Sequence, residues 1–234
     1  MAEIDSPNIA LLIDADNVSP DGIDAVLTVL AELGQVNIRR AYGNWAKDAL
    51  KRWDAITNRY GIRPYQQFDL TRGKNATDMA MTIDAIDLLY QGKVDGFGIM
   101  SSDSDFTPLV TRLRQDGLPV YCFGDGRTSQ ALQTACTRFI DVEKLMAGER
   151  KSEGDGRTAI DQELVDLLGT AWKAATRDDE GYARLQEVGQ IAGNRSSFDV
   201  RNFGYKRLSE MFKELDNFDL KRRSDGQFYV RRLR

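Results

Sequence analysis

Two apolar segments of the chain each end in a pair of aspartates. These acids are Asp14 and Asp16, after residues 9–13, and Asp103 and Asp105, after residues 96–100. Short apolar runs are typical of strands buried in a parallel sheet, and parallel strands bring their carboxyl ends to one edge. Carboxylates gathered there repel one another unless a cation neutralises them. Such oxygen ligands suit Mg²⁺ or Mn²⁺, and these ions commonly serve phosphate chemistry.

The chain contains no histidine. This excludes Ser-His-Asp triads, histidine general acids and His-ligated zinc, and leaves metal-activated water as the strongest catalytic option. The two cysteines, Cys122 and Cys136, fall in predicted interior elements, without the spacing of a disulfide framework or a metal knuckle. We therefore expect both to be buried, reduced thiols.

A third acid, Asp78, is a candidate for the same edge. It stands three residues after Asn75, a pattern also typical of a helix cap followed by an acid in the first turn. The loop before this helix lies at the carboxyl edge of the sheet, so the first turn should point a side chain back at that edge. Lys74 in the same loop could reach a phosphate or neutralise the acids, and both roles place it near the site.

Local structure competes with chemistry at the remaining candidates. Asp16 and Asn17 can equally organise a turn from strand to helix. A capping role could explain Asp105, and since one cap suffices, Asp103 is left without a local structural role. Ser101 and Ser102 could donate hydrogen bonds to a scissile phosphate or to metal-bound water.

The elements that would position these residues alternate between strand and helix over the first 145 residues. This alternation predicts an α/β fold with a mostly parallel sheet covered by helices. The strands are expected at 9–13, 36–42, 62–68, 96–101, 119–123 and about 139–142, with helices at about 20–33, 45–60, 76–90, between 107 and 117, and near 130.

A polar, glycine-rich stretch at 149–156 predicts a linker between a first domain, 1–148, and a second, 157–234. In the second domain three helical apolar faces precede Ser-Asp-Gly, a turn signal flanked by 218–222 and 227–231. Three helices and a basic hairpin predict a small winged-helix-like domain.

The charge is distributed unevenly. Residues 1–148 carry 15 Lys and Arg against 20 Asp and Glu, whereas residues 157–234 carry 15 against 13. An acidic first domain with a basic C-terminal edge fits a metal site joined to an anion-binding domain, although a solvated charge run would look the same. No apolar stretch approaches the length of a membrane span, and the N-terminus lacks a basic signal segment, so we expect a cytoplasmic protein with no membrane partner.

Three spaced motifs resemble the NYN domain family, in its bacterial LabA-like branch, which is related to PIN nucleases. They are Ile-Asp-Ala-Asp-Asn-Val at 13–18, Lys-Asn-Ala-Thr-Asp-Met-Ala-Met at 74–81 and Ser-Ser-Asp-Ser-Asp-Phe-Thr-Pro-Leu-Val at 101–110. The resemblance implies a PIN-like α/β/α sandwich and an endoribonuclease that requires Mg²⁺ or Mn²⁺. Carried across, the acids of the family fall on Asp14, Asp78, Asp103 and Asp105, and its loop asparagine on Asn17. The branch commonly has Gly at position 102, where Ser stands here.

The second domain is similar to the OST-HTH, or LOTUS, domain, which binds RNA or protein and is often joined to NYN domains. The similarity runs from 181–185 through 198–208 to the final hairpin. It implies RNA as a partner and leaves a protein partner and a homodimer open. Residues 201–207 should begin a helix, whose exposed face and whose hairpin wing could meet phosphates. The candidates for these contacts are Arg201, Lys206, Arg223 and Arg231.

Two other functions compete with the ribonuclease. Asp14-Ala15-Asp16 after an apolar strand also resembles the haloacid-dehalogenase phosphatase motif, with Asp14 as nucleophile. That family expects a further acid near 128–129, where Thr128 and Ser129 stand. The second rival is a regulatory RNA- or protein-binding adaptor with a vestigial acidic site. The intact acid set argues against such decay without establishing turnover.

Overall fold

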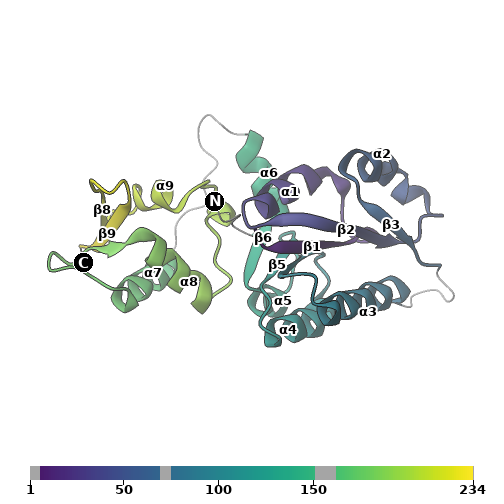
Figure 1. Cartoon of the computed structure of the whole chain (residues 1–234). Helices are drawn as coiled ribbons and strands as arrows, with labels where there is room; N and C mark the ends of the chain where they lie inside the picture. Colours follow the sequence, from purple (N-terminus) through teal and green to yellow (C-terminus); the bar gives the residue numbers. More distant parts are fainter. Residues whose placement is uncertain (1–5, 69–74, 151–161, 234) are drawn as a thin grey trace, which may run out of the picture. The chain divides into compact units, whose positions relative to one another are not determined.

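The structure is a computed structural model that describes residues 6–68, 75–150 and 162–233 (Figure 1). The chain divides into two compact units, residues 1–143 and 144–234. Each unit has its own apolar core, and each is described separately below. Within the described ranges, no helix is both long and apolar enough to cross a membrane.

The first unit is built on a six-stranded sheet in which every pairing is parallel, so the predicted sheet is confirmed. Its order is β3-β2-β1-β4-β5-β6. The chain therefore moves outward from β1 in one direction, and then in the other from β4. The carboxyl ends of β1 and β4 flank the position where ligands bind in open α/β sheets. The strands span Asn8–Asp14, Gln35–Gly43, Arg63–Gln66, Gly96–Met100, Val120–Gly124 and Arg138–Asp141 for β1 to β6.

Helices cover both faces of this sheet, as expected for an α/β/α sandwich (Figure 1). On one face lie α1 (Ile23–Ala31) and α2 (Lys51–Tyr60), and on the other α3 (Ala76–Gln91), α4 (Thr107–Gln115) and α5 (Gln130–Ala135). Short 3-10 turns precede three of the helices: η1 (Pro20–Gly22), η2 (Asp48–Leu50) and η3 (Ser104–Phe106).

Strand alternation assigns the core residues to the two faces. Leu12, Tyr42 and Phe97 pack with Met81 and Leu88 of α3 in one buried cluster. Cys122 and Cys136 belong to the same cluster and are free thiols, so the prediction for both is confirmed. Burial of this apolar surface fixes α3 on the sheet and thereby fixes the position of its first turn.

Two predicted boundaries in the first unit differ from the structure. The helix expected from Trp45 begins at Lys51, because the preceding residues contact other elements: the Trp45 indole N–H donates to the Tyr65 carbonyl at 2.9 Å. A further helix, α6, spans Val142–Arg150 and so includes the first two residues of the stretch predicted as a linker. The rest of that stretch lies outside the described residues.

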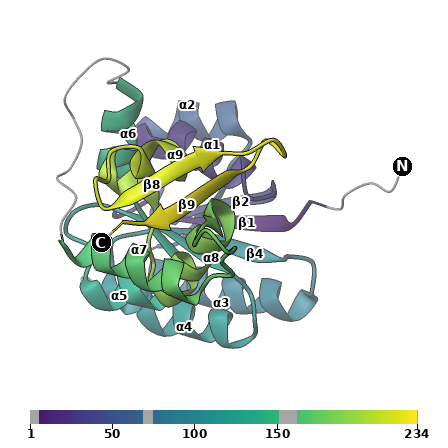
Figure 2. The same cartoon turned by 90° about the vertical axis from the view of Figure 1, so that its left-hand side faces the viewer.

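Within residues 162–233, the second unit has three α-helices and a three-stranded antiparallel sheet in the order β7-β9-β8, of which Figure 2 labels β8 and β9. The predicted hairpin is confirmed as β8 and β9, and the unit has the winged-helix-like form that the sequence predicts. In chain order its elements are α7 (Gln162–Ala174), β7 (Ala183–Arg184), α8 (Leu185–Arg195), η4 (Val200–Phe203), α9 (Leu208–Phe212), β8 (Phe218–Arg222) and β9 (Phe228–Arg232).

The helix expected to begin within 201–207 is wrongly placed. Arg201 belongs to η4, which ends at Gly204 with a positive φ of 82°. The buried Tyr205 follows, and α9 begins only at Leu208. Gly204 adopts a left-handed conformation, which few other residue types adopt without strain. It therefore ends η4 before α9 begins. Arg201 and Lys206 therefore do not share a helix.

Candidate functional site

Asp14 is the last residue of β1, and its carboxylate is fully buried at the carboxyl edge of the sheet. Asn17 Nδ2 donates to it at 2.9 Å and Ser101 Oγ at 2.8 Å. Burial raises the pKa of Asp14, and these two donors only partly oppose the increase. The chain thus keeps a carboxyl group in its interior with neutral donors and, among the described residues, no ion pair.

Ser101 connects the ends of the two central strands. It is buried just after β4, whose Met100 pairs with Ile13 of β1. Its Oγ donates to Asp14 and accepts from the backbone N–H of Asp103 at 3.1 Å. Ser101 therefore fixes Asp14 and the start of the acidic loop relative to each other.

Asp103 has a local structural role, contrary to the sequence interpretation. It is the N-cap of η3, and its Oδ1 accepts from the N–H of Asp105 at 2.9 Å. The 3-10 turn before α4 moves the cap one turn earlier than expected. Asp105 is exposed and is not the cap. Its Oδ2 accepts from Asn75 Nδ2 at 2.9 Å, a contact that joins the loop after β4 to the start of α3.

Asp78, in the first turn of α3, carries the clearest sign that the acids lie together. Its pKa is raised to about 6, first by burial and then by the charges of four nearby carboxylates: Asp14, Asp103, Asp105 and Asp16. Salt screens the repulsion between carboxylates that are more than about one Debye length apart, so these groups must lie close together. Two hydrogen bonds agree with this, since Thr77 donates to Asp16 and Asn75 donates to Asp105, so the first turn of α3 lies at the edge where β1 and β4 end.

Asp16 differs from these acids because it has its own counterion. Its carboxylate accepts from Lys47 Nζ at 3.1 Å, from Thr77 Oγ1 at 2.9 Å and from the Asn44 N–H at 3.2 Å. Sequence reasoning missed Lys47, Thr77 and Asn44. No local pattern could reveal them, because Asn44 and Lys47 come from the loop after β2 and Thr77 from α3, both distant from Asp16 in the chain.

Asn17, Ser102 and Lys74 complete the expected set at this edge. Asn17 reaches the site, with both of its contacts to Asp14 oxygens. Ser102 accepts from the Asp125 N–H at 3.0 Å and thus joins the loops after β4 and β5. Lys74 lies outside the described residues.

The donor set fits a hard divalent cation by its chemistry, since it offers carboxylate oxygens and no nitrogen or sulfur. In the part of the chain that the structure describes, however, no three acidic or cysteine side chains form a group that could hold a metal ion. One carboxylate oxygen already accepts a hydrogen bond from a protein donor in each of Asp14, Asp103 and Asp105. The carboxylates therefore lie close enough to repel one another, but in the described structure they are not arranged as a set of metal ligands.

Most of the basic candidates in the second unit have acidic partners there. Arg201 pairs with the buried Asp199 at 2.9 Å. In the hairpin, Arg223 pairs with Asp178, and Arg231 lies 3.5 Å from Asp219. These ion pairs neutralise cations that the sequence assigned to phosphates.

Aromatic rings lie against Arg223 and Arg231, the two arginines that we call the basic face of the second unit. Arg231 lies 4.8 Å from the centroid of Tyr182, and Arg223 lies 4.4 Å from that of Tyr229. Lys206 is different, because it is exposed and forms no ion pair with any described residue. Among the basic candidates, Lys206 is therefore the one whose charge is most available.

Two family models match the chain in the expected order. The NYN domain model matches residues 8–143, and the OST-HTH/LOTUS domain model matches residues 158–230. The first match contains the acids of the sheet edge, and the second contains the winged-helix-like unit with its basic hairpin.

Proteins similar to this chain are known from other organisms. An uncharacterized protein of Methanocaldococcus jannaschii is 29% identical over 140 residues, which are 57% of this chain and 55% of that protein. The chain thus spans about half the length of that relative. A crystal structure of a protein of unknown function from Vibrio parahaemolyticus aligns with a TM-score of 0.51 and 24% identity, over 60% of this chain and 96% of that one. This second likeness concerns the fold alone.

Proposed function

Because the chain belongs to the NYN domain family, which is related to PIN nucleases, we propose that it is a metal-dependent endoribonuclease. The observation that carries this proposal is the gathering of carboxylates at the β1–β4 edge, where Thr77 binds Asp16 and Asn75 binds Asp105. The raised pKa of Asp78 agrees with this geometry. A cluster that repels itself lowers stability, and cation binding would relieve that cost. The OST-HTH/LOTUS domain supports RNA as the substrate.

Asp14, Asp78, Asp103 and Asp105 would hold Mg²⁺ or Mn²⁺. When bound, such an ion lowers the pKa of water and stabilises charge that develops on a phosphate. Ser101 orients Asp14 through its 2.8 Å hydrogen bond and, through the Asp103 N–H, sets the start of the acidic loop. The second Asp14 oxygen is oriented by Asn17. These hydrogen bonds orient Asp14 and the start of the acidic loop before any ion binds.

Lys47 has a supporting role in this proposal. By pairing with Asp16 it removes one negative charge from the approach to a polyanionic substrate. Thr77 ties Asp16 to the first turn of α3, next to Asp78. The Thr77 contact holds the turn that carries Asp78 against the loop after β1, and the Lys47 contact joins that loop to the one after β2.

The surroundings of Asp14 argue against the phosphatase hypothesis. A nucleophilic carboxylate must reach the phosphorus of its substrate, whereas the Asp14 side chain is fully buried behind Asn17 and Ser101. The adaptor reading differs from the nuclease in one measurable respect, since an adaptor binds RNA without cutting it.

A circular, labelled RNA provides the experiment, because only an endonuclease can open a circle. The full chain is incubated with it in Mn²⁺, in Mg²⁺ or in EDTA, beside Asp103→Asn and the control Asp87→Asn on the exposed side of α3. We expect linear product with a divalent ion for the native chain and for Asp87→Asn, and none in EDTA or for Asp103→Asn. Binding without linear product under every condition would favour the adaptor.

A further inference from the structure

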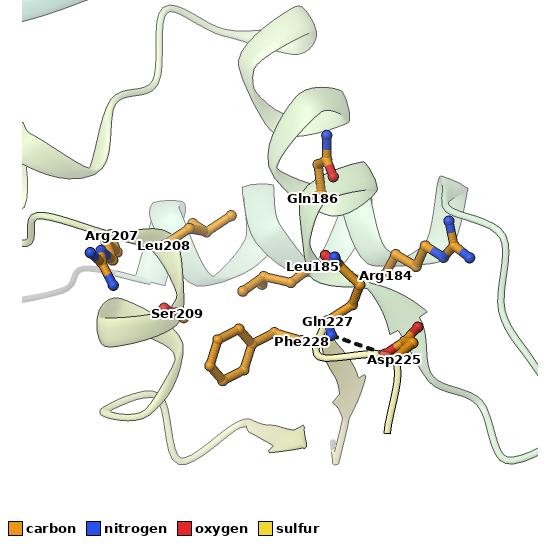
Figure 3. A pocket seen from close by; sticks show the side chains of 9 residues that line it. All are labelled: Arg184, Leu185, Gln186, Arg207, Leu208, Ser209, Asp225, Gln227 and Phe228. Atoms are coloured by element: carbon orange, nitrogen blue, oxygen red, sulfur yellow. Dashed lines mark hydrogen bonds between the residues drawn. The ribbon is translucent and has the colours of Figure 1, made fainter. Parts of the chain in front are cut away.

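The second unit contains a pocket of about 570 Å³ where α8 and α9 begin beside the β8–β9 turn (Figure 3). This volume lies in the range of small-molecule sites. Leu185, Leu208 and Phe228 form its apolar part, and Arg184 and Arg207 contribute positive charge. Apart from Arg207, which lies in the segment 201–207 that the sequence assigned to phosphate contacts, none of these residues belongs to the predicted site, and the pocket lies entirely within one unit.

The apolar part offers a surface on which a flat ring can stack. Figure 3 shows the Phe228 ring and the side chains of Leu185 and Leu208 directed into the same space. Phe228 is half-buried, and the Arg222 guanidinium lies 5.8 Å from its ring centroid. A half-buried aromatic ring at an open pocket retains an unused face, and nucleobases stack on such faces.

The two arginines lie on opposite sides of this apolar part (Figure 3). Arg207 is exposed and forms no ion pair with any described residue. Arg184 lies close to the Tyr229 hydroxyl, which raises the pKa of its guanidinium. Both side chains are therefore charged and reachable from solvent.

The one carboxylate in the lining, Asp225, is already engaged by the protein. Its Oδ1 accepts from the Gln227 N–H at 2.9 Å, and its Oδ2 accepts from the Tyr229 hydroxyl at 2.9 Å. These contacts hold the turn that carries Phe228. Two cations and one occupied carboxylate leave the pocket with a net positive charge, which complements an anionic ligand.

We propose that this pocket takes one unpaired base of a single-stranded RNA, with Arg184 and Arg207 near the phosphates on either side. The inference rests on the proposed function in that RNA is the ligand. An apolar, aromatic centre flanked by cations matches a strand whose base turns inward and whose backbone stays outside. Bases in a duplex are stacked and paired and cannot enter, so the pocket would select single strands.

The test measures the contribution of the base separately from that of the phosphates. Fluorescence anisotropy of the full chain in EDTA is recorded with a labelled 12-nucleotide oligouridine, with an abasic strand of the same length, and with a duplex. We expect the abasic strand and the duplex to bind about 5- to 100-fold more weakly than the oligouridine. The free-strand affinity itself shows whether RNA is bound at all.

Two variants assign this difference to the pocket. Phe228→Leu keeps the apolar contact but removes the ring, so affinity for oligouridine should fall about 5-fold or more while affinity for the abasic strand stays unchanged. Arg207→Gln, at an exposed position, should lower the slope of log affinity against log salt by about 0.7. Arg195→Gln removes the same charge at the other end of α8, outside the pocket, and should leave the base preference unchanged.

Equal affinity for the oligouridine and the abasic strand would overturn the inference, as would an unchanged base preference in Phe228→Leu with native thermal stability. Cleavage of circular RNA under those same outcomes would leave the proposed function intact. If the full chain binds no strand even at low salt, both the inference and RNA as the ligand of this unit are wrong.

Discussion

The acidic edge of the first unit and the basic face of the second both gather like charges, but the two regions treat those charges differently. On the basic face, Arg223 and Arg231 have acidic partners and rest on tyrosine rings. On the acidic edge, Asp14 has only neutral donors, and the pKa of Asp78 is raised to about 6, first by burial and then by its acidic neighbours. The two arginines are neutralised within the fold, whereas Asp14 and Asp78 have no oppositely charged partner among the described residues.

The same contrast occurs within a single helix. Asp84 of α3 accepts from Arg40 at 2.5 Å and from the buried Tyr42 hydroxyl, whereas Asp78, less than two turns earlier, faces other acids. Asp84 fastens α3 to β2, and Asp78 gains nothing comparable from the protein. A charge that the fold leaves uncompensated is therefore a better guide to function than the presence of the charge itself.

Removing the charge of Asp78 should have the largest effect of the changes that test the contrast between the two regions. Asp78→Asn should lower the rate of RNA cleavage by about 10²- to 10³-fold, because an oxygen donor to the ion and its charge are lost. The same change at Asp87, exposed on α3, serves as the control and should leave the rate within about twofold. Native activity in Asp78→Asn would remove this residue from the site.

Stability should respond in the opposite direction. The carboxyl of Asp78 has a pKa near 3.8 when unfolded and about 6 when folded, so the folded chain binds more protons between these values and loses stability as pH rises through them. In EDTA at pH 8, Asp78→Asn should be more stable than the native chain by about 1 kcal/mol, discounted for solvent screening, and the gain should vanish below about pH 4. Thermal unfolding followed by circular dichroism measures both.

Cutting the chain after Arg150, where α6 ends, separates the two regions themselves. Each unit has its own buried core, so residues 1–150 should fold. This fragment should cleave at saturating RNA at close to the rate of the full chain, with RNA affinity lowered about tenfold or more. A folded fragment that cleaves nothing would mean that the second unit contributes to the chemistry.

Asp84→Asn tests the neutralised acid of α3. Loss of its half-buried pair with Arg40 and of the full charge opposite Tyr42 should destabilise the chain by about 1–3 kcal/mol. The expected sign is opposite to that for Asp78→Asn, although the substitution and the helix are the same. If chemical denaturation gives equal signs for the two variants, the two acids are not distinguished as the comparison requires.

The smallest effect is expected on the basic face. Because Arg223 and Arg231 are paired within the unit, replacing both by Gln should change RNA affinity by less than about threefold at 0.15 M salt. Replacing both Lys206 and Arg207 by Gln should lower the slope of log RNA affinity against log salt by about 1.4, or about 0.7 for each cation, since these cations have no acidic partner among the described residues. The reverse order of effects would restore the contacts that the sequence predicts.

The sequence predicts the acidic edge well because its cause is local and periodic. Buried apolar runs predict parallel strands, and parallel strands place Asp14 and Asp103 at one edge without any knowledge of side-chain contacts. The position of Asp78 follows from the same rule. The resemblances to the NYN and OST-HTH/LOTUS families add the identity and order of the two domains, which composition alone could not supply.

What the sequence could not predict is which charges find partners. Lys47 reaches Asp16 across 31 positions in the chain, and Arg223 reaches Asp178 across 45. Such pairs depend on how separate elements pack, which hydrophobic periodicity does not encode. The Asp103 cap was missed for a smaller reason, because a 3-10 turn before a helix shifts the cap by one turn.

The central claim is that the acidic edge is left charged for a divalent cation, and a thermal shift with Mn²⁺ tests it most directly. Unfolding of the full chain is followed in EDTA and in increasing Mn²⁺, beside Asp103→Asn, whose amide keeps the oxygen that caps η3, and beside Asp87→Asn. We expect Mn²⁺ to raise the unfolding temperature of the native chain and of Asp87→Asn in a saturable way, and to leave Asp103→Asn almost unchanged. An equal shift in all three proteins, or none in the native chain, would contradict the account.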